Sequence, residues 1–101
     1  MTERQRPVEQ DKNLRRSNFN PVEENFTDEQ AKLEALRCLS CKNPQCSKGC
    51  PVSVKIPDFI KKVKEGDLKG AGDIIRQDNM LPSVCGRICP QERQCESKCI
   101  L

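Results

Sequence analysis

The stretch that decides the fold runs from residue 38 to residue 51 and reads Cys38-Leu-Ser-Cys41-Lys-Asn-Pro-Gln-Cys46-Ser-Lys-Gly-Cys50-Pro51. A second stretch repeats its main feature and reads Cys85-Gly-Arg-Ile-Cys89-Pro90-Gln-Glu-Arg-Gln-Cys95-Glu-Ser-Lys-Cys99. The two stretches contain all 8 cysteines of the chain, four in each, and each includes a Cys-Pro step. Two groups of four thiols in this pattern predict ligands for two metal centres.

The composition favours a small domain that depends on such centres. The chain has 101 residues, of which 35% are hydrophobic and 33% charged, and its only aromatic residues are 3 phenylalanines. A chain of this length buries a modest core and often needs a metal or cross-links to stay folded. The chain has 8 cysteines in 101 residues, well above ordinary usage, so we expect the cysteines to supply this metal binding or cross-linking.

A disulfide framework is one alternative, and it requires an oxidising compartment. The N-terminus reads Met1-Thr-Glu-Arg-Gln-Arg-Pro7, which lacks the apolar core of a secretion signal. No apolar run approaches the roughly 18 residues that a membrane-spanning helix needs. We therefore expect a cytoplasmic protein with reduced thiols and no membrane partner.

Structural zinc is a second alternative, and it stays open at this point. Because the chain has no histidine, two zinc sites would use all 8 cysteines. Zinc ribbons usually pair two Cys-x2-Cys knuckles, and only Cys38 and Cys41 have that spacing. Iron–sulfur ligation fits better. Bacterial ferredoxins use Cys-x2-Cys-x2-Cys-x3-Cys-Pro, and residues 38–51 read Cys-x2-Cys-x4-Cys-x3-Cys-Pro.

The charge pattern says little about partners. The formal net charge is +3, and two oxidised cubane clusters with their thiolates, at about −2 each, would change it to roughly −1. Basic residues beside the cysteines are expected to offset cluster charge and to influence reduction potential. They are Arg37, Lys42, Lys48, Arg87, Arg93 and Lys98. Since basic and acidic residues alternate and aromatic residues are few, nucleic acid is not an expected partner.

The sequence offers no candidate catalytic residues. It has no histidine and no recognisable pair of nucleophile and base. It also lacks the Gly-x-Gly-x-x-Gly fingerprint of dinucleotide-binding folds, so neither FAD nor NADPH is expected to bind these residues. The chain by itself is therefore not expected to be an enzyme.

Helices are predicted around the cysteines. The stretch Thr27-Asp-Glu-Gln30 is a capping box and predicts a helix over 28–37 that ends at the first cysteine. Residues 27–101 are expected to form one helical domain. Residues 1–26 show no helical or strand period, so we expect an extended and partly disordered arm.

The cysteine-free run between the two groups predicts a helical hairpin. Apolar residues recur at i, i+3, i+4 and i+7 from Ile56, which predicts a helix that ends at Gly66. Asp67 is the expected N-cap of a second helix, and Asn79 its expected C-terminal cap. Pro82 is expected to begin a further helical turn, which carries Cys85 and Cys89. The hairpin would bring the second group of cysteines against the first.

Four stretches of the sequence match a known family. They read Glu34-Ala-Leu-Arg-Cys-Leu-Ser-Cys-Lys-Asn-Pro-Gln-Cys46, Gly49-Cys-Pro-Val52, Ile56-Pro-Asp-Phe-Ile60 and Val84-Cys-Gly-Arg-Ile-Cys-Pro-Gln-Glu-Arg-Gln-Cys-Glu96. With them, the chain resembles the N-terminal iron–sulfur domain of the glutamate synthase small (beta) subunit. Similar domains occur in NADH-dependent ferredoxin:NADP oxidoreductase and at the N-terminus of dihydropyrimidine dehydrogenase.

The resemblance implies an all-α, alpha-helical ferredoxin-like domain that holds two 4Fe-4S clusters. It implies that one cluster binds Cys38, Cys41, Cys46 and Cys99, so that ligation crosses between the two groups. The other cluster would bind Cys50, Cys89 and Cys95. Its fourth ligand in the family can be a Gln or Glu further along the chain, beyond Leu101, and Cys85 is the alternative within the sequence. Ligation without crossing, with one cluster per group of four, remains the local alternative.

The resemblance also implies a function. The clusters would pass single electrons between a flavin that handles NAD(P)H and a partner redox site, within an NADPH-dependent glutamate synthase-like oxidoreductase. FAD and NADPH would bind a later region of a longer polypeptide, and the large subunit of the enzyme would be a partner. Because the chain stops soon after Cys99, we expect it to be a fragment of such a polypeptide. Two rival hypotheses are a redox-silent, metal-stapled docking module and a redox-sensing thiol switch.

Overall fold

The computed structural model describes residues 3–101, and within them every regular element is a helix. The α-helices are α1 (Asp28–Ala35), α2 (Gln45–Gly49), α3 (Ile56–Glu65), α4 (Leu68–Arg76) and α5 (Pro82–Ile88). Two single turns of 3-10 helix follow, η1 (Gln91–Arg93) and η2 (Glu96–Lys98). The described residues contain no β-strand, only an isolated antiparallel bridge between Glu9 and Glu23. The prediction of an all-α fold is confirmed.

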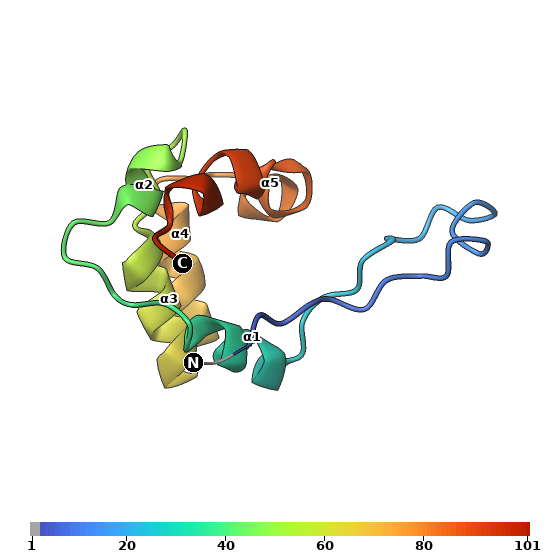
Figure 1. Cartoon of the computed structure of the whole chain (residues 1–101), viewed down its shortest axis with the longest axis horizontal. Coiled ribbons are helices and arrows are strands. Elements are labelled where there is room, and N and C mark those ends of the chain that lie inside the picture. The colour runs from blue at the N-terminus through green and yellow to red at the C-terminus, as the bar shows by residue number, and fades with distance from the viewer. Residues whose placement is uncertain (1–2) are drawn as a thin grey trace.

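Helices α3 and α4 form the predicted hairpin and pack along one another (Figure 1). Gly66 ends α3 in the left-handed region with φ +83°, a conformation that glycine adopts without steric cost. Asp67 then caps α4, because its Oδ1 accepts a hydrogen bond from the Gly70 backbone N–H at 2.9 Å. Helix α1 also packs against α3. This hairpin is the scaffold to which both groups of cysteines attach.

The capping box predicted for the first helix is present. The Thr27 hydroxyl accepts a hydrogen bond from the Gln30 backbone N–H at 3.2 Å, and the Gln30 side chain accepts one from the Thr27 backbone N–H at 3.0 Å. The helix ends at Ala35, two residues before the predicted end. Its last turn tightens, with the Cys38 backbone N–H bonded to the Ala35 carbonyl at 3.1 Å. Cys38 therefore leaves the helix at the start of a loop.

The end of α4 also differs from the prediction. The helix stops at Arg76, with Gln77 at the C-cap, so Asn79 is not the cap residue. Its side-chain oxygen instead accepts a hydrogen bond from the Leu81 backbone N–H at 2.9 Å, which forms a turn just before Pro82. Because a proline disfavours helical geometry in the residue before it, this turn separates α4 from α5.

The segment from α5 to the C-terminus folds back over α2. Helix α2 packs on η2 (Figure 1), and this contact depends on Gly49. A Cβ atom on residue 49 would lie 2.8 Å from the Gln94 carbonyl oxygen and 2.8 Å from the Cγ atom of Lys98. Real Cβ atoms do not come this close to other heavy atoms, so only glycine allows the two segments to meet. The contact brings the first group of cysteines beside the second.

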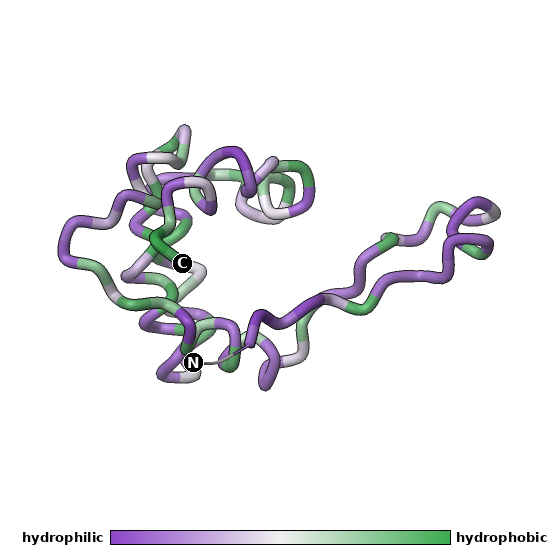
Figure 2. Tube along the Cα trace, in the orientation of Figure 1, coloured by the Kyte–Doolittle hydropathy of each residue, from purple (hydrophilic) through white to green (hydrophobic). Residues whose placement is uncertain are grey.

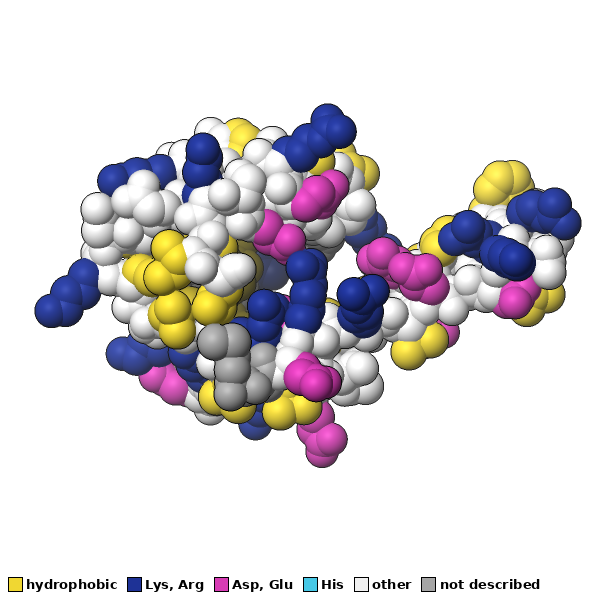
Figure 3. Space-filling model, in the orientation of Figure 1, with side chains coloured by type: hydrophobic (Ala, Val, Ile, Leu, Met, Phe, Trp, Pro, Cys, Tyr) yellow, Lys and Arg dark blue, Asp and Glu magenta, His cyan; other side chains and the backbone are white. Residues whose placement is uncertain are grey.

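The hydrophobic core is very small. Only three hydrophobic residues of the described chain are buried, namely Ala35, Val54 and Ala71. Many larger apolar side chains are exposed, among them Ile88 at 74% and Ile100 at 74%. Figure 3 shows such side chains gathered near the C-terminus of the chain, and Lys and Arg side chains spread over the same face. Apolar burial alone is weak support for a domain of this size.

Residues 3–26 form a mostly hydrophilic arm, which starts beside α1, where the Gln5 N–H donates to Glu34 Oε2 at 2.7 Å, and then projects away from the helices (Figures 1 and 2). Its two halves are joined by backbone hydrogen bonds of 2.7 Å, from Gln10 N–H to the Val22 carbonyl and from Glu24 N–H to the Val8 carbonyl. Met1 and Thr2, the first residues of the predicted arm, lie outside the described residues. Within residues 3–101, no helix has the length and apolar character needed to cross a membrane.

Candidate metal centres

All eight cysteines lie in the described part of the chain, and the structure joins none of them in a disulfide. Six thiols are half-buried, while Cys41 and Cys99 are exposed. Cys46 and Cys85 lie in the short helices α2 and α5, and the other six lie in loops, at helix caps or beside single turns of 3-10 helix. The thiols are therefore available as ligands.

One set of thiols brings together residues from both ends of the helical part. Burial raises the pKa of the Cys46 thiol, and a hydrogen bond from the Ser47 backbone opposes that shift. Negative charge on Cys99 and on Cys38 raises the pKa of Cys46 further, which requires these sulfurs to lie close by. Cys38 follows α1, Cys46 is in α2 and Cys99 follows η2. The structure thus places both the first and the last cysteine of the chain near Cys46.

A second set lies at the other end of α2. Burial raises the pKa of the Cys95 thiol, while a hydrogen bond from the backbone of Glu96 lowers it. The charges of the Glu96 carboxylate, Cys89 and Cys50 raise this pKa further. Cys50 is the C-cap of α2, and Cys89 is the C-cap of α5. These two cysteines, distant in sequence, therefore share the surroundings of Cys95.

The remaining two cysteines are placed differently. Cys41 is exposed in the loop between α1 and α2. Cys85 lies in α5, and its Sγ–H donates to the Asn79 side-chain oxygen over 3.8 Å. That contact directs the Cys85 thiol toward the turn that precedes α5.

The arrangement fits a cluster better than a single ion. Among residues 3–101, no three Cys, Asp or Glu side chains converge on a point where one metal ion could bind. A zinc ion holds its cysteine sulfurs about 2.3 Å away, so its ligands must nearly touch. A 4Fe-4S cluster is a larger body whose ligands attach to separate iron atoms, and it needs sulfurs that are near one another but not in contact. Around Cys46 and around Cys95, two further thiols lie near enough to affect the pKa.

Sequence reasoning missed two polar side chains that contact the cysteines. Lys64 Nζ donates to the Cys38 carbonyl oxygen at 2.9 Å and lies 3.4 Å from the Ser40 hydroxyl. Gln94 Oε1 lies 2.7 Å from the Cys89 sulfur. Lys64 could not be found from spacing, because it is 26 residues from Cys38 along the chain. Gln94 is adjacent to Cys95 but carries no charge and belongs to no periodic pattern.

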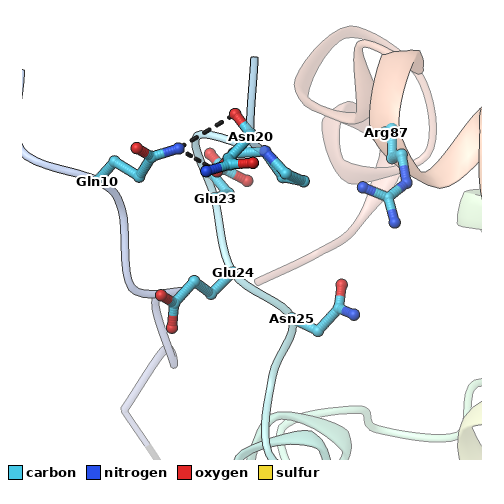
Figure 4. Close-up of a pocket in the computed structure, with 7 residues that line it drawn as sticks. Gln10, Asn20, Glu23, Glu24, Asn25 and Arg87 are labelled. Atoms are coloured by element: carbon cyan, nitrogen blue, oxygen red, sulfur yellow. Dashed lines mark hydrogen bonds between the residues drawn. The ribbon is translucent and has the colours of Figure 1, made fainter. Parts of the chain in front are cut away.

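Two of the basic residues predicted to offset cluster charge have other surroundings. Arg37, just beyond the end of α1, forms an ion pair with Glu34 in the last turn of that helix. Arg87 faces a cleft of about 470 Å³ between α5 and the arm (Figure 4). The cleft is lined by Gln10, Asn20, Pro21, Glu23, Glu24, Asn25 and Arg87. No cysteine lines it, so it is separate from the metal centres.

Residues 15–101 match the family described as "Dihydropyrimidine dehydrogenase domain II, 4Fe-4S cluster". The chain belongs to this family of 4Fe-4S domains. The resemblance found in the sequence is thereby confirmed, and so is the preference for iron–sulfur ligation over zinc.

Relatives of this 4Fe-4S domain are longer proteins. The chain is 47% identical over 88 residues to the glutamate synthase (NADPH) small chain of Escherichia coli, covering 87% of this chain and 19% of the relative. The corresponding protein of Azospirillum brasilense is 44% identical over 87 residues, covering 86% and 18%. The NAD-dependent dihydropyrimidine dehydrogenase subunit PreT of E. coli is 42% identical over 74 residues, covering 73% and 18%. The chain spans about a fifth of the length of these relatives.

Proposed function

We propose that the chain is an electron-transfer domain that binds two 4Fe-4S clusters. One observation supports the proposal: Cys38 and Cys99 lie near enough to Cys46 to raise its pKa, and Cys50 and Cys89 lie near enough to Cys95 to do the same. We assign Cys38, Cys41, Cys46 and Cys99 to the first cluster. We assign Cys50, Cys89 and Cys95 to the second, whose fourth ligand is Cys85 or a residue beyond Leu101.

Helix α2 supports the crossed assignment. It carries Cys46 and ends at Cys50, and it has five residues. At 1.5 Å per residue, such a helix is about 7.5 Å long, so its two ends lie close together. With this ligand set, a shared helix of this length would hold the two clusters close together, as a relay requires. When bound, each cluster accepts or releases one electron at a time.

The protein's own residues hold and tune the clusters. The thiols supply the ligands, while the Ser47 and Glu96 backbones donate hydrogen bonds to Cys46 and Cys95. Hydrogen bonds to sulfur and nearby charges set the reduction potential of a cluster. We assign chemistry on a substrate to other parts of a larger enzyme.

The names of the relatives suggest what that larger enzyme is. We propose a cytoplasmic oxidoreductase similar to NADPH-dependent glutamate synthase, in which residues 27–101 form the iron–sulfur domain and residues 1–26 its arm. FAD and NADPH would bind a later domain of the same polypeptide, and electrons would leave toward a large subunit.

Anaerobic reconstitution with iron and sulfide tests the cluster number. We expect about eight iron atoms and eight sulfide ions per chain, and electron paramagnetic resonance signals after reduction with dithionite. About four of each would contradict two clusters. Zinc bound in place of iron, with no reducible signal, would contradict electron transfer and favour the docking module.

Single substitutions test the crossing. With crossed ligation, Cys99→Ala and Cys38→Ala remove the same resonance signal, while Cys89→Ala removes the other. Ligation within each group of four would instead give Cys99→Ala and Cys89→Ala the same spectrum. The control is Ser17→Ala, a substitution in the arm and remote from every cysteine. It shows how much cluster is lost during preparation alone.

A further inference from the structure

Gln94 has an unusual position beside the second set of thiols. It lies between η1 and η2, half-buried, with φ −112° and ψ −106°. Its backbone is fixed on both sides, since its N–H donates to the Gln91 carbonyl at 3.0 Å and its carbonyl accepts from the Ser97 hydroxyl at 2.7 Å. The same carbonyl lies against Gly49. A residue held in this way presents its side chain in a fixed direction.

That direction is toward Cys89. In the structure the Cys89 Sγ–H donates to Gln94 Oε1 over 2.7 Å. A cysteine that coordinates iron has lost its proton, so its sulfur can only accept hydrogen bonds. An amide oxygen facing a bound sulfur would be repelled. A rotation of half a turn about the Cγ–Cδ bond of Gln94 exchanges the positions of Oε1 and Nε2 and directs an N–H at the Cys89 sulfur. The rotation needs no extra space, because the oxygen and the NH2 group of an amide have nearly the same shape.

Direct ligation by Gln94 is not compatible with this geometry. The ligands of one cluster attach to different irons and diverge from one another. Two ligand atoms on neighbouring irons are therefore further apart than the 2.7 Å between Gln94 Oε1 and Cys89 Sγ. Rotation of the amide in place needs no displacement of the chain.

We propose that the Gln94 amide donates a hydrogen bond to the Cys89 sulfur of the second cluster and raises the reduction potential of that cluster. The inference rests on the proposed ligand set of Cys50, Cys89 and Cys95. Reduction by dithionite adds one electron to the cluster and hence negative charge to its sulfurs. An N–H directed at one of those sulfurs stabilises the reduced form more than the oxidised form.

The test compares reconstituted Gln94→Met with the unmodified protein in a potentiometric titration followed by paramagnetic resonance. Methionine keeps the length of glutamine without its donor. We expect one of the two clusters to show about a tenfold smaller ratio of reduced to oxidised form at a given potential, a shift of about −59 mV. The other cluster should keep its potential, and the iron content should not change.

Gln91→Met is the matched control. Gln91 has the same side chain three residues earlier, and its Nε2 donates to the Gly86 carbonyl at 3.3 Å instead of to a thiol. Both potentials should stay unchanged in this variant. The inference is overturned if Gln94→Met leaves both potentials in place, shifts both equally, or loses iron. The iron count of the unmodified protein tests the ligand set separately, so failure of the proposed function is distinguishable from failure of this inference.

Discussion

The backbone of Gly49 lies against the carbonyl of Gln94, so close that a Cβ on residue 49 would be 2.8 Å from that oxygen. Gly49 lies between Cys46 and Cys50, and Gln94 lies beside Cys95. The contact therefore sets the spacing of thiols that come from opposite ends of the helical part.

Gly49→Ala should weaken both centres. The added methyl forces α2 away from Gln94 and from Lys98, and overpacking of this kind costs about 1–3 kcal/mol. We expect lower iron content after reconstitution and a lower midpoint in thermal unfolding followed by circular dichroism. Gly86→Ala is the control, since a Cβ there meets no atom within 4 Å. Equal behaviour of the two variants would contradict the role of the Gly49 contact.

Removal of the metal should destabilise the domain strongly. Ala35, Val54 and Ala71 are the buried hydrophobic residues of the described chain, so little apolar burial remains without clusters. Metal ligation can contribute folding free energy on the order of 10 kcal/mol. We expect the chelated protein to unfold at lower temperature and over a broader range than the reconstituted protein. A sharp transition at the same temperature in both forms would show that the polypeptide is stable by itself.

Stability of the metal-free chain should decrease as the pH rises through the thiol range. Burial raises the pKa values of Cys46 and Cys95 above the ordinary 9.0. Between the unfolded pKa and the raised folded pKa, the folded state binds more protons than the unfolded state, so the stabilisation present below about pH 9 is lost above it.

Chemical unfolding of the metal-free chain at a series of pH values, with sucrose added to keep it folded, measures this loss. Cys46→Ser with Cys95→Ser should give a shallower pH dependence. An unchanged slope in that double variant would assign the effect to other groups.

Lys64→Met should lower the reduction potential of the first cluster alone. The Lys64 ammonium donates to the Cys38 carbonyl at 2.9 Å, and a positive charge near a cluster favours its reduced, more negative form. Lys61→Met, on an exposed position of the same helix, is the control and should leave both potentials unchanged. A shift confined to the second cluster would contradict the placement of Cys38 in the first.

The helices were predictable because local signals determine them. The apolar spacing from Ile56, the glycine at 66 and the capping box at Thr27 each act within a few residues, and all three are present in the structure. Asn79 was assigned the wrong role because a side-chain oxygen can serve a helix end or a turn equally well, and Pro82 decides for the turn.

Contacts between distant residues could not be predicted in the same way. The sequence places Lys64 on a helix but contains nothing that directs its ammonium to the Cys38 carbonyl. Gln94 acquires its position from the fold of η1 and η2 and from the space that Gly49 leaves. The crossing of the two groups of cysteines came from the family resemblance, and the spacing of Cys46 and Cys50 was compatible with it. Spacing left the uncrossed arrangement open.

The proximity of Cys38 and Cys99 to the same thiol has a consequence for biosynthesis. In the proposed ligand sets, each cluster needs cysteines from both halves of the chain, so neither can be completed while the ribosome has made only the first half. Joining residues 38 and 99 through one cluster also closes a long loop. By the entropy relation for cross-links, this closure lowers the conformational entropy of the unfolded chain by about 4 kcal/mol. Cluster insertion is then the step that closes this loop, and it can take place only after residue 99 has been synthesised.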